Sequence, residues 1–450
     1  MSRDDPYQLD PGQVAEPPAS LGGMLLHCGP GLILSASIVG SGELIATTSL
    51  GAKTGFTALW VILVSCTVKV ALQLEMGRHT IQTGLPCLQA LDGLGGLRLR
   101  NTHWSVWAWA ALQPIKMLQM GGIVGGVAEL THAAFPDVAT RTACWLTAVV
   151  VALLVAFEGY RFIERLSLSL LGAFTLVTFA SVLALQWTPY AISTSQIAEG
   201  LRFEMPTGAL LFIVGAFGLT GVGGDEIMHY SYWLIEKGYA SKTGAYRPND
   251  AQWLERARGW TRVMYVDALL SMAVYTTVTI AFYLLGAAVL AKQQDLPESY
   301  GMIQTLATMY TETLGPKAEW VFLGGAFAVL FSTLFSALAA WTRIITDAFG
   351  VFGCIDFRNR QSRRRSIAAL AWALPLGWAA LYLGFQNPQF MVLLGGVATS
   401  GILLVVAVAV WQFRYRKSLP ELNPGRLYDA ALWVSLMSIV AFAVLSVSSK

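Results

Sequence analysis

Charged residues are scarce in this sequence, and their scarcity excludes an ordinary soluble domain. Only 13% of the 450 residues are Asp, Glu, Lys or Arg, whereas 55% are hydrophobic. A soluble domain carries about 25% charged residues, so the composition predicts an integral membrane protein with several spans. The formal net charge of +3 is also too small to indicate binding to nucleic acid.

Cysteine is sparse as well. The five cysteines form no CxxC pair and lack the spacing of metal ligands, so the sequence predicts neither a disulfide framework nor a zinc site. No nucleophile, base and orienting group occur together at a recognisable spacing, and we therefore expect neither an enzyme nor a bound cofactor. The cysteines are Cys28, Cys66, Cys87, Cys144 and Cys354.

Residues 1–23 contain no basic segment followed by a cleavage site, so we expect no cleaved signal peptide. The segment is rich in proline and carries several acidic residues. This composition predicts a disordered cytosolic N-terminal tail.

Long apolar stretches make up most of the remaining chain. A helix needs about 20 apolar residues to cross a bilayer, and this rule predicts an all-α protein with about eleven transmembrane helices. If the N-terminus is cytosolic, most Lys and Arg residues of the loops fall on the cytosolic side, and the C-terminus lies outside. We therefore expect a multi-pass protein of the cell (inner) membrane. The predicted spans are 27–52, 56–76, 104–130, 141–159, 166–187, 207–235, 261–291, 318–348, 366–385, 388–413 and 427–447.

The first span is interrupted in its middle. Gly40, Ser41 and Gly42 weaken any helix drawn through the segment, and Glu43 is the only formal charge between residues 24 and 50. Within a bilayer, irregular backbone persists only where it is buried in protein or lines a cavity, and an acid at that depth indicates a functional site. The break is therefore predicted to be a binding site.

The sixth span repeats this pattern. Gly223, Gly224, Asp225 and Glu226 echo the four residues from Gly40 to Glu43, five spans later. An odd offset means that the two interrupted helices cross the membrane in opposite directions, which is typical of an inverted five-helix repeat with a site at mid-membrane. The predicted parts are a first repeat over 24–187, a second repeat over 207–413 and an additional helix over 427–447.

The two breaks together supply only oxygen ligands. Three carboxylates at one depth would repel each other unless a cation or protons neutralised them. No methionine or cysteine lies in either break, so the ligand set favours a hard cation such as Mg²⁺, Ca²⁺ or Mn²⁺. The acids are Glu43, Asp225 and Glu226, and the neutral oxygens belong to Ser37, Ser41 and Thr220.

Three further polar residues lie within the predicted spans. His229 follows Asp225 by one helical turn, and it is either a ligand, a proton acceptor or a packed side chain without such a role. Lys69 and Lys116 lie too deep to reach the membrane surface, so each should pair with an acid. Such a pair is either purely structural or part of the coupling of transport.

The residues around the first break resemble a known family. Gly29-Pro30-Gly31, and the run from Gly51 to Phe56, are similar to the first-span region of the natural resistance-associated macrophage protein (Nramp) family of divalent metal transporters. The resemblance implies a leucine-transporter-like fold, with a 5+5 inverted repeat and discontinuous first and sixth helices. It also implies a metal ion as substrate, with the lipid bilayer as the surroundings.

The motifs that bind metal in that family differ here. The family's Asp-Pro-Gly-Asn run becomes Gly40 to Glu43, and its Met-Pro-His-Asn run becomes Gly223 to Glu226. By the same resemblance, the two carbonyl ligands would fall on Ser37 and Thr220. The third span has Lys116 where the family has an acidic pair. The loss of the methionine is similar to the Nramp-related magnesium transporters, a divergent branch of the family.

Three functions remain open at this stage. The first is a secondary transporter or facilitator that moves a hard divalent cation into the cytosol by alternating access. The second is transport of a small organic solute, because Gly40-Ser41-Gly42 is similar to the break of amino-acid permeases of the same fold, and nearby acids would suit an amine. The third is a sensor or scaffold without flux, although the longest cytosolic loop, about 236–261, is short for an output domain.

Overall fold

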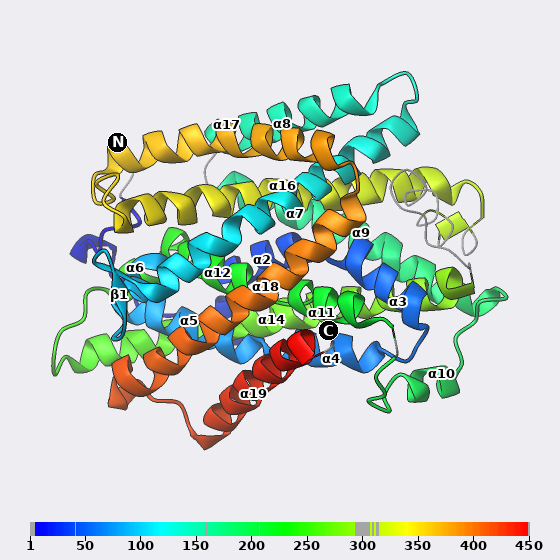
Figure 1. Ribbon diagram of the computed structural model, residues 1–450. Coiled ribbons are helices and arrows are strands. Elements are labelled where there is room, and N and C mark those ends of the chain that lie inside the picture. Colours follow the sequence, from blue (N-terminus) through cyan, green and yellow to red (C-terminus); the bar gives the residue numbers. More distant parts are fainter. Residues whose placement is uncertain are drawn as a thin grey trace.

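The structure is a computed structural model that describes residues 5–40, 42–157, 160–206, 208–292, 307, 310–311 and 315–448. It is an elongated bundle of helices with one short two-stranded hairpin (Figure 1). The elements are η1 (Pro11–Gln13), α1 (Leu21–His27), α2 (Pro30–Ile38), η2 (Gly42–Thr47), α3 (Thr48–Thr54), α4 (Leu59–Val68), α5 (Val70–Thr83), α6 (Cys87–Asp92), β1 (Arg98–Leu99), β2 (Thr102–His103), α7 (Trp104–Ala134), α8 (Thr140–Phe157), α9 (Tyr160–Ala184), η3 (Leu185–Trp187), α10 (Thr194–Glu199), α11 (Leu210–Leu219), α12 (Gly224–Lys237), α13 (Tyr239–Thr243), α14 (Ala251–Val289), η4 (Leu290–Lys292), α16 (Ala318–Val351), α17 (Arg360–Phe385), α18 (Pro388–Gln412), η5 (Phe413–Lys417), η6 (Pro420–Leu422) and α19 (Arg426–Ser448).

In its described residues, each predicted span consists mainly of helix. By length and composition, six helices of the described residues can cross a membrane: α4 with α5, α14, α16, α17, α18 with η5, and α19. The count rises to seven if α1 and α2, which are bent by 58° at a short break, form one span. The remaining predicted spans correspond to α2 to α3, α7, α8, α9 and α11 to α12. The number eleven stays a prediction.

Both interrupted helices are present, and they run in opposite directions. The chain passes from α2 to α3 from left to right in Figure 1, and from α11 to α12 from right to left. The first break separates α2 from the π-helical turn η2, and the second separates α11 from α12. The glycine-rich positions predicted from the sequence are therefore the positions where the helices end.

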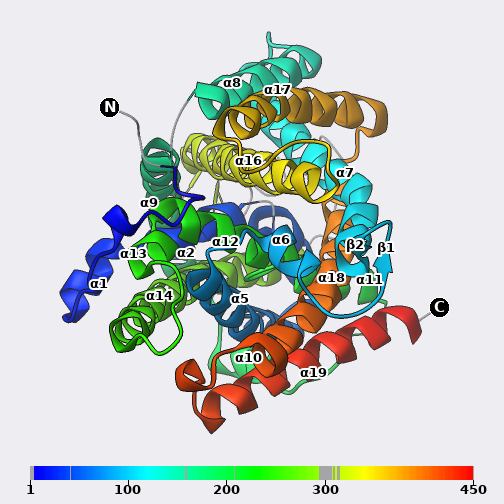
Figure 2. The ribbon, with the colours of Figure 1, turned by 90° about the vertical axis from the view of Figure 1, so that its left-hand side faces the viewer.

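The interrupted helices lie inside the bundle. Seen along the helices, α2 and α12 are near the centre, with α14, α16 and α18 around them, while α8 with α17 and α19 lie on opposite outer sides (Figure 2). Close packing at the centre depends on small residues, as is usual between membrane helices. A Cβ atom on Gly218 of α11 would lie 2.0 Å from the carbonyl oxygen of Gly396 on α18. No larger residue fits there without separating these helices.

Two buried aspartates fix the starts of other helices. The carboxylate of Asp267 on α14 accepts the N–H groups of Gly29 and Gly31, at 2.8 and 2.6 Å, and the hydroxyl of Tyr230 at 2.9 Å. The first N–H groups of a helix have no partner within it, so this carboxylate caps α2 from a distant element. Asp347 of α16 has the same role for α6, where it accepts the N–H of Leu88 at 3.0 Å.

The N-terminal segment contacts the bundle through a few residues. The disordered tail stays a prediction, and residues 1–4 lie outside the described part of the chain. The hydroxyl of Tyr7 donates to Glu236 at 3.0 Å, and Asp5 pairs with Arg363. The Arg363 guanidinium also lies 4.6 Å from the centre of the Tyr7 ring. An aromatic ring and a carboxylate thus meet complementary groups at the ends of the helices, which composition alone did not indicate.

We predict that Asp267→Ala lowers the thermal stability of the purified protein. Two buried N–H groups and one hydroxyl would lose their acceptor, at a cost of about 3 kcal/mol. A matched control is Asp356→Ala, because Asp356 is exposed and accepts a single N–H, from Arg358. The control should cost less than about 1 kcal/mol. Equal shifts of the melting temperature for the two variants would contradict the capping role.

Candidate functional site

The first break is held by Glu43. Helix α2 ends at Ile38, and Glu43 in the following π-helical turn is fully buried. One carboxylate oxygen accepts the hydroxyl of Thr279 at 2.8 Å, and the other accepts the N–H of Gly40 at 3.3 Å. The same N–H also donates to the carbonyl of Ile38 at 2.8 Å, so the carboxylate is a second acceptor for an amide at the break. Ser41, a predicted site residue between Gly40 and Glu43, lies outside the described residues.

The second break is held by Lys69. Helix α11 ends at Leu219, and the Lys69 ammonium lies 2.7 Å from the carbonyl oxygen of Phe217 and 2.6 Å from that of Thr220. A positive charge at the C-terminal end of a helix is favourable, because the last carbonyls carry partial negative charge. The hydroxyl of Ser65 donates to the same two carbonyls, each at 3.0 Å. The carbonyl of Thr220, predicted as a cation ligand, is therefore already occupied by protein donors.

Helix α12 begins at Gly224, with the two acids of the second break in its first turn. The Asp225 carboxylate lies 2.9 Å from the ammonium of Lys116, which reaches across from the middle of α7. Glu226 follows with a partly exposed side chain, and its Oε2 would lie 2.3 Å from a Cβ atom at Gly223. Glycine at 223 thus leaves room for this carboxylate.

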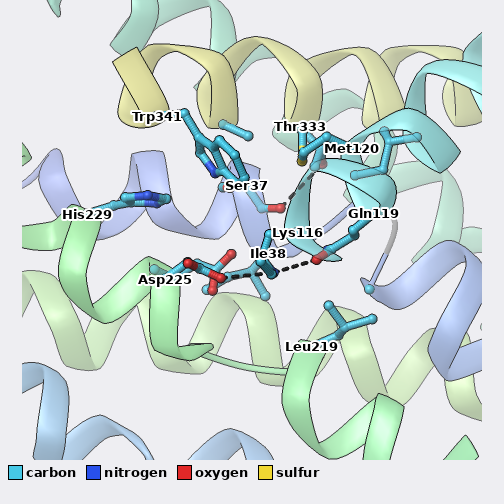
Figure 3. A pocket seen from close by; sticks show the side chains of 14 residues that line it. Ser37, Ile38, Lys116, Gln119, Met120, Leu219, Asp225, His229, Thr333 and Trp341 are labelled. Atoms are coloured by element: carbon cyan, nitrogen blue, oxygen red, sulfur yellow. Dashed lines mark hydrogen bonds and ion pairs between the residues drawn. The ribbon is translucent and has the colours of Figure 1, made fainter. Parts of the chain in front are cut away.

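A small cavity lies between the two breaks (Figure 3). Its volume is about 30 Å³, and since one water occupies about 10–15 Å³ on this scale, it has room for about two waters or one ion. Carboxylates and neutral oxygens share its wall with apolar side chains. The lining residues are Ser37, Ile38, Gly42, Lys116, Gln119, Met120, Ile123, Leu219, Asp225, Glu226, His229, Thr333, Ala337 and Trp341.

The structure brings only some of the predicted residues to the cavity. Ser37, Asp225, Glu226, His229 and Lys116 line it. The other predicted residues border the breaks and do not line this cavity; in the described part of the chain these are Gly40, Glu43, Lys69, Thr220 and Gly223.

Metal ligands are not gathered as the sequence predicted. Among the described residues, no three His, Cys, Asp or Glu side chains are placed to hold one ion together. The physical reason is visible at each acid, since Glu43 is held by Thr279 and Gly40, whereas Asp225 is held by Lys116. Of the three acids that the sequence placed in one site, Asp225 and Glu226 line the cavity and Glu43 does not.

Several lining residues escaped the sequence analysis. Gln119 and Met120 follow Lys116 by three and four residues, so they lie on the same face of α7, and this spacing could have identified them. Thr333 and Trp341 come from α16, far along the chain. They carry no charge, glycine or proline signal, and only the packing of α16 against α2 brings them to the site.

Comparison with known proteins places the chain in a family. Residues 31–449 match the family model described as natural resistance-associated macrophage protein-like. The chain belongs to the Nramp family. This assignment confirms the resemblance seen around the first span, while the closeness to the magnesium-transporting branch stays a prediction.

Relatives of this Nramp protein are distant in sequence. It is 23% identical over 401 residues to a divalent metal cation transporter, MntH, of Acidiphilium cryptum, covering 88% of this chain and 83% of the relative. It is 22% identical over 433 residues to an uncharacterised protein of Pasteurella multocida, covering 94% and 92%.

Solved structures show the same fold. A variant of the manganese transporter of Eremococcus coleocola aligns with a TM-score of 0.66 at 16% identity, covering 98% of this chain and 91% of that one. Mhp1, a nucleobase-cation-symport-1 family transporter, aligns at 0.60 and 13% identity, covering 98% and 96%. These neighbours share the leucine-transporter-like fold, so the predicted fold class is confirmed.

We predict that the two glycines of the first break differ in their tolerance of a methyl group. A Cβ atom at Gly40 would lie 1.6 Å from Oγ1 and 2.7 Å from Cβ of Thr333, whereas one at Gly42 would meet nothing closer than 3.3 Å, at the Leu219 carbonyl. Gly40→Ala should lower the free energy of unfolding by about 2–3 kcal/mol through overpacking. Gly42→Ala is the control, with a small effect. Similar melting temperatures for both variants would contradict the close contact of the first break with α16.

Proposed function

We propose that this protein moves a divalent metal cation across the membrane by alternating access, with the ion bound in the cavity between α2, α7, α12 and α16. The observation that carries the proposal is a cavity of ionic size at both helix breaks, with the carboxylates of Asp225 and Glu226 in its wall. The family assignment, and curated relatives named as divalent metal cation transporters, support the same substrate class.

The proposed ligands are oxygen atoms. Asp225 and Glu226 supply negative charge at the N-terminal end of α12, and Ser37 and Gln119 supply neutral oxygens from α2 and α7. Carboxylate and neutral oxygens suit Mg²⁺ and Mn²⁺. In this proposal Glu43 shapes the first break and Lys69 shapes the second, and neither binds the ion directly.

A small organic solute is the competing substrate. A cavity of about 30 Å³ has room for about two waters, at about 10–15 Å³ each on this scale. An amino acid is several times larger than one water and does not fit. The size of the cavity therefore favours an ion over an amine or amino acid in this conformation.

Uptake into the cytosol is the direction we propose. The distribution of Lys and Arg supports an orientation with the N-terminus in the cytosol and the C-terminus outside. The acidic pair that the family carries in its third span is absent from α7 between Gln113 and Gly126, where Lys116 lies instead. The proposed coupling therefore differs from the family's proton route.

The test is uptake of Mn²⁺ and Mg²⁺ by proteoliposomes that contain the full-length protein. Asp225→Asn and Glu226→Gln should each reduce the initial rate about tenfold or more at low ion concentration, because each removes a negative charge that faces the ion. Glu199→Gln is the control, since Glu199 is exposed on α10, and it should transport at the wild-type rate.

Wild-type rates in both cavity variants would show that the ion binds elsewhere. Absence of Mn²⁺ and Mg²⁺ uptake by the wild type, together with thermal stabilisation by amines or amino acids, would instead favour the organic solute.

A further inference from the structure

The ammonium of Lys116 is bound on three sides within the cavity. It lies 2.9 Å from Oδ2 of Asp225 on α12 and 2.5 Å from Oγ1 of Thr399 on α18, and it also donates to Oε1 of Gln119 on its own helix. Lysine and aspartate side chains are both nearly inaccessible, each 4% exposed. Two of these oxygens, on Thr399 and Gln119, accept hydrogen bonds from the ammonium, and the third, on Asp225, is its ion-pair partner.

Lys116 is also the counter-charge of Asp225. In the described part of the chain, Oδ2 of Asp225 accepts no hydrogen bond from another donor. A buried carboxylate without a cation is strongly unfavourable, so the ammonium occupies the position that a transported cation would need on this oxygen. A divalent ion and an ammonium on one carboxylate oxygen would repel each other strongly at such a short distance.

Lys69, a second buried lysine near the breaks, has different partners from Lys116. Its ammonium is bound to the carbonyls of Phe217 and Thr220 and lies 5.0 Å from the centre of the Phe217 ring, and Lys69 does not line the cavity. It stabilises the end of α11 whether or not an ion is present. Lys116, by contrast, lines the cavity and pairs with a carboxylate that faces it.

We propose that Lys116 is a tethered competitor of the transported cation, which must be displaced from Asp225 before a divalent ion can bind there. The proposal rests on the proposed function and adds a residue that sets the affinity of the site. The flexible four-carbon stem of lysine allows the ammonium to withdraw without a change in the helices. When the ion leaves, the ammonium returns to Asp225, so the empty protein never exposes that carboxylate uncompensated.

This competition has a consequence for the transport cycle. A carrier that must change conformation while empty needs its buried carboxylates neutralised, and Lys116 supplies that charge without a second transported ion. Removing the ammonium should therefore favour exchange of one bound ion for another over net uptake. Weakening a competitor should also raise the affinity for the ion, whereas loss of a purely structural contact would lower it or leave it unchanged.

The experiment is isothermal titration of purified full-length protein with Mn²⁺ and with Mg²⁺. Lys116→Gln should bind the ion at least about tenfold more tightly than the wild type, since two carboxylates then face the ion without an internal cation. Lys53→Gln is the matched control: it removes the same charge from an exposed position at the end of α3, and its Kd should stay within about twofold of the wild type.

Thr399→Val provides a second variant that keeps every charge and the shape of the side chain. It removes one acceptor of the Lys116 ammonium and should tighten binding of Mn²⁺ by about two- to fivefold. If Lys116→Gln does not fold, an unchanged or weaker affinity of Thr399→Val overturns the proposal.

The outcomes separate this proposal from the proposed function. Binding of Mn²⁺ by the wild type, with equal or weaker binding by Lys116→Gln, overturns the competition and leaves transport intact. Absence of binding in the wild type with binding in Lys116→Gln supports the competition. Absence of binding in both overturns the proposed function and this proposal with it.

A transport assay tests the consequence for the cycle. In proteoliposomes, Lys116→Gln should retain Mn²⁺ exchange while net uptake falls at least about fivefold. An equal loss of the exchange rate and the net uptake rate contradicts the proposal that Lys116 helps the empty protein to change conformation.

Discussion

Backbone polar groups that lose their helical partners inside a membrane must find others within the protein, and this constraint governs the centre of the molecule. The two breaks meet it in opposite ways. At the first, the carboxylate of Glu43 accepts an amide N–H from Gly40; at the second, the ammonium of Lys69 donates to two carbonyls at the end of α11. At the first break a carboxylate accepts from a backbone N–H, and at the second an ammonium donates to backbone carbonyls. Neither break therefore depends on a bound ion for its stability.

The cavity follows from these two solutions. Because Glu43 and Lys69 are committed to the backbone, the charged groups that face the cavity are those of Asp225, Glu226 and Lys116. The first two lie in the first turn of α12, where the helix dipole favours negative charge. The site therefore combines a helix end that attracts a cation with an internal cation that opposes it. In the proposed ion site, the balance between the two would set how strongly an ion binds.

The sequence predicted the elements of this site better than their partners. Glycines and isolated acids identified both breaks, because Gly40 and Gly223 interrupt otherwise apolar helices. Lys69 and Lys116 were both expected to pair with an acid; Lys116 pairs with Asp225, whereas Lys69 donates to two backbone carbonyls. What could not be predicted was which oxygen each lysine contacts. Lys69 donates to the carbonyl of Phe217, which is 148 residues away in the sequence. This contact depends on how α4, α5 and α11 pack together, and the sequence near Lys69 does not indicate that packing.

The same contacts decide which helices are linked to α12. Tyr230 and Tyr232 donate to Asp267 on α14 and Asp347 on α16, and Asp267 also caps α2. Helices α2, α12 and α14 therefore share one carboxylate, and separating them would leave buried donors without a partner. Lys116 of α7 links two other helices, because it forms an ion pair with Asp225 of α12 and a hydrogen bond with Thr399 of α18. Under our proposal, an ion that displaced Lys116 would remove this link from α12 to α7 and α18, while the bonds from α12 toward α2 and α14 would persist. Occupancy of the cavity would then alter the contact between the interrupted helices and the helices around them.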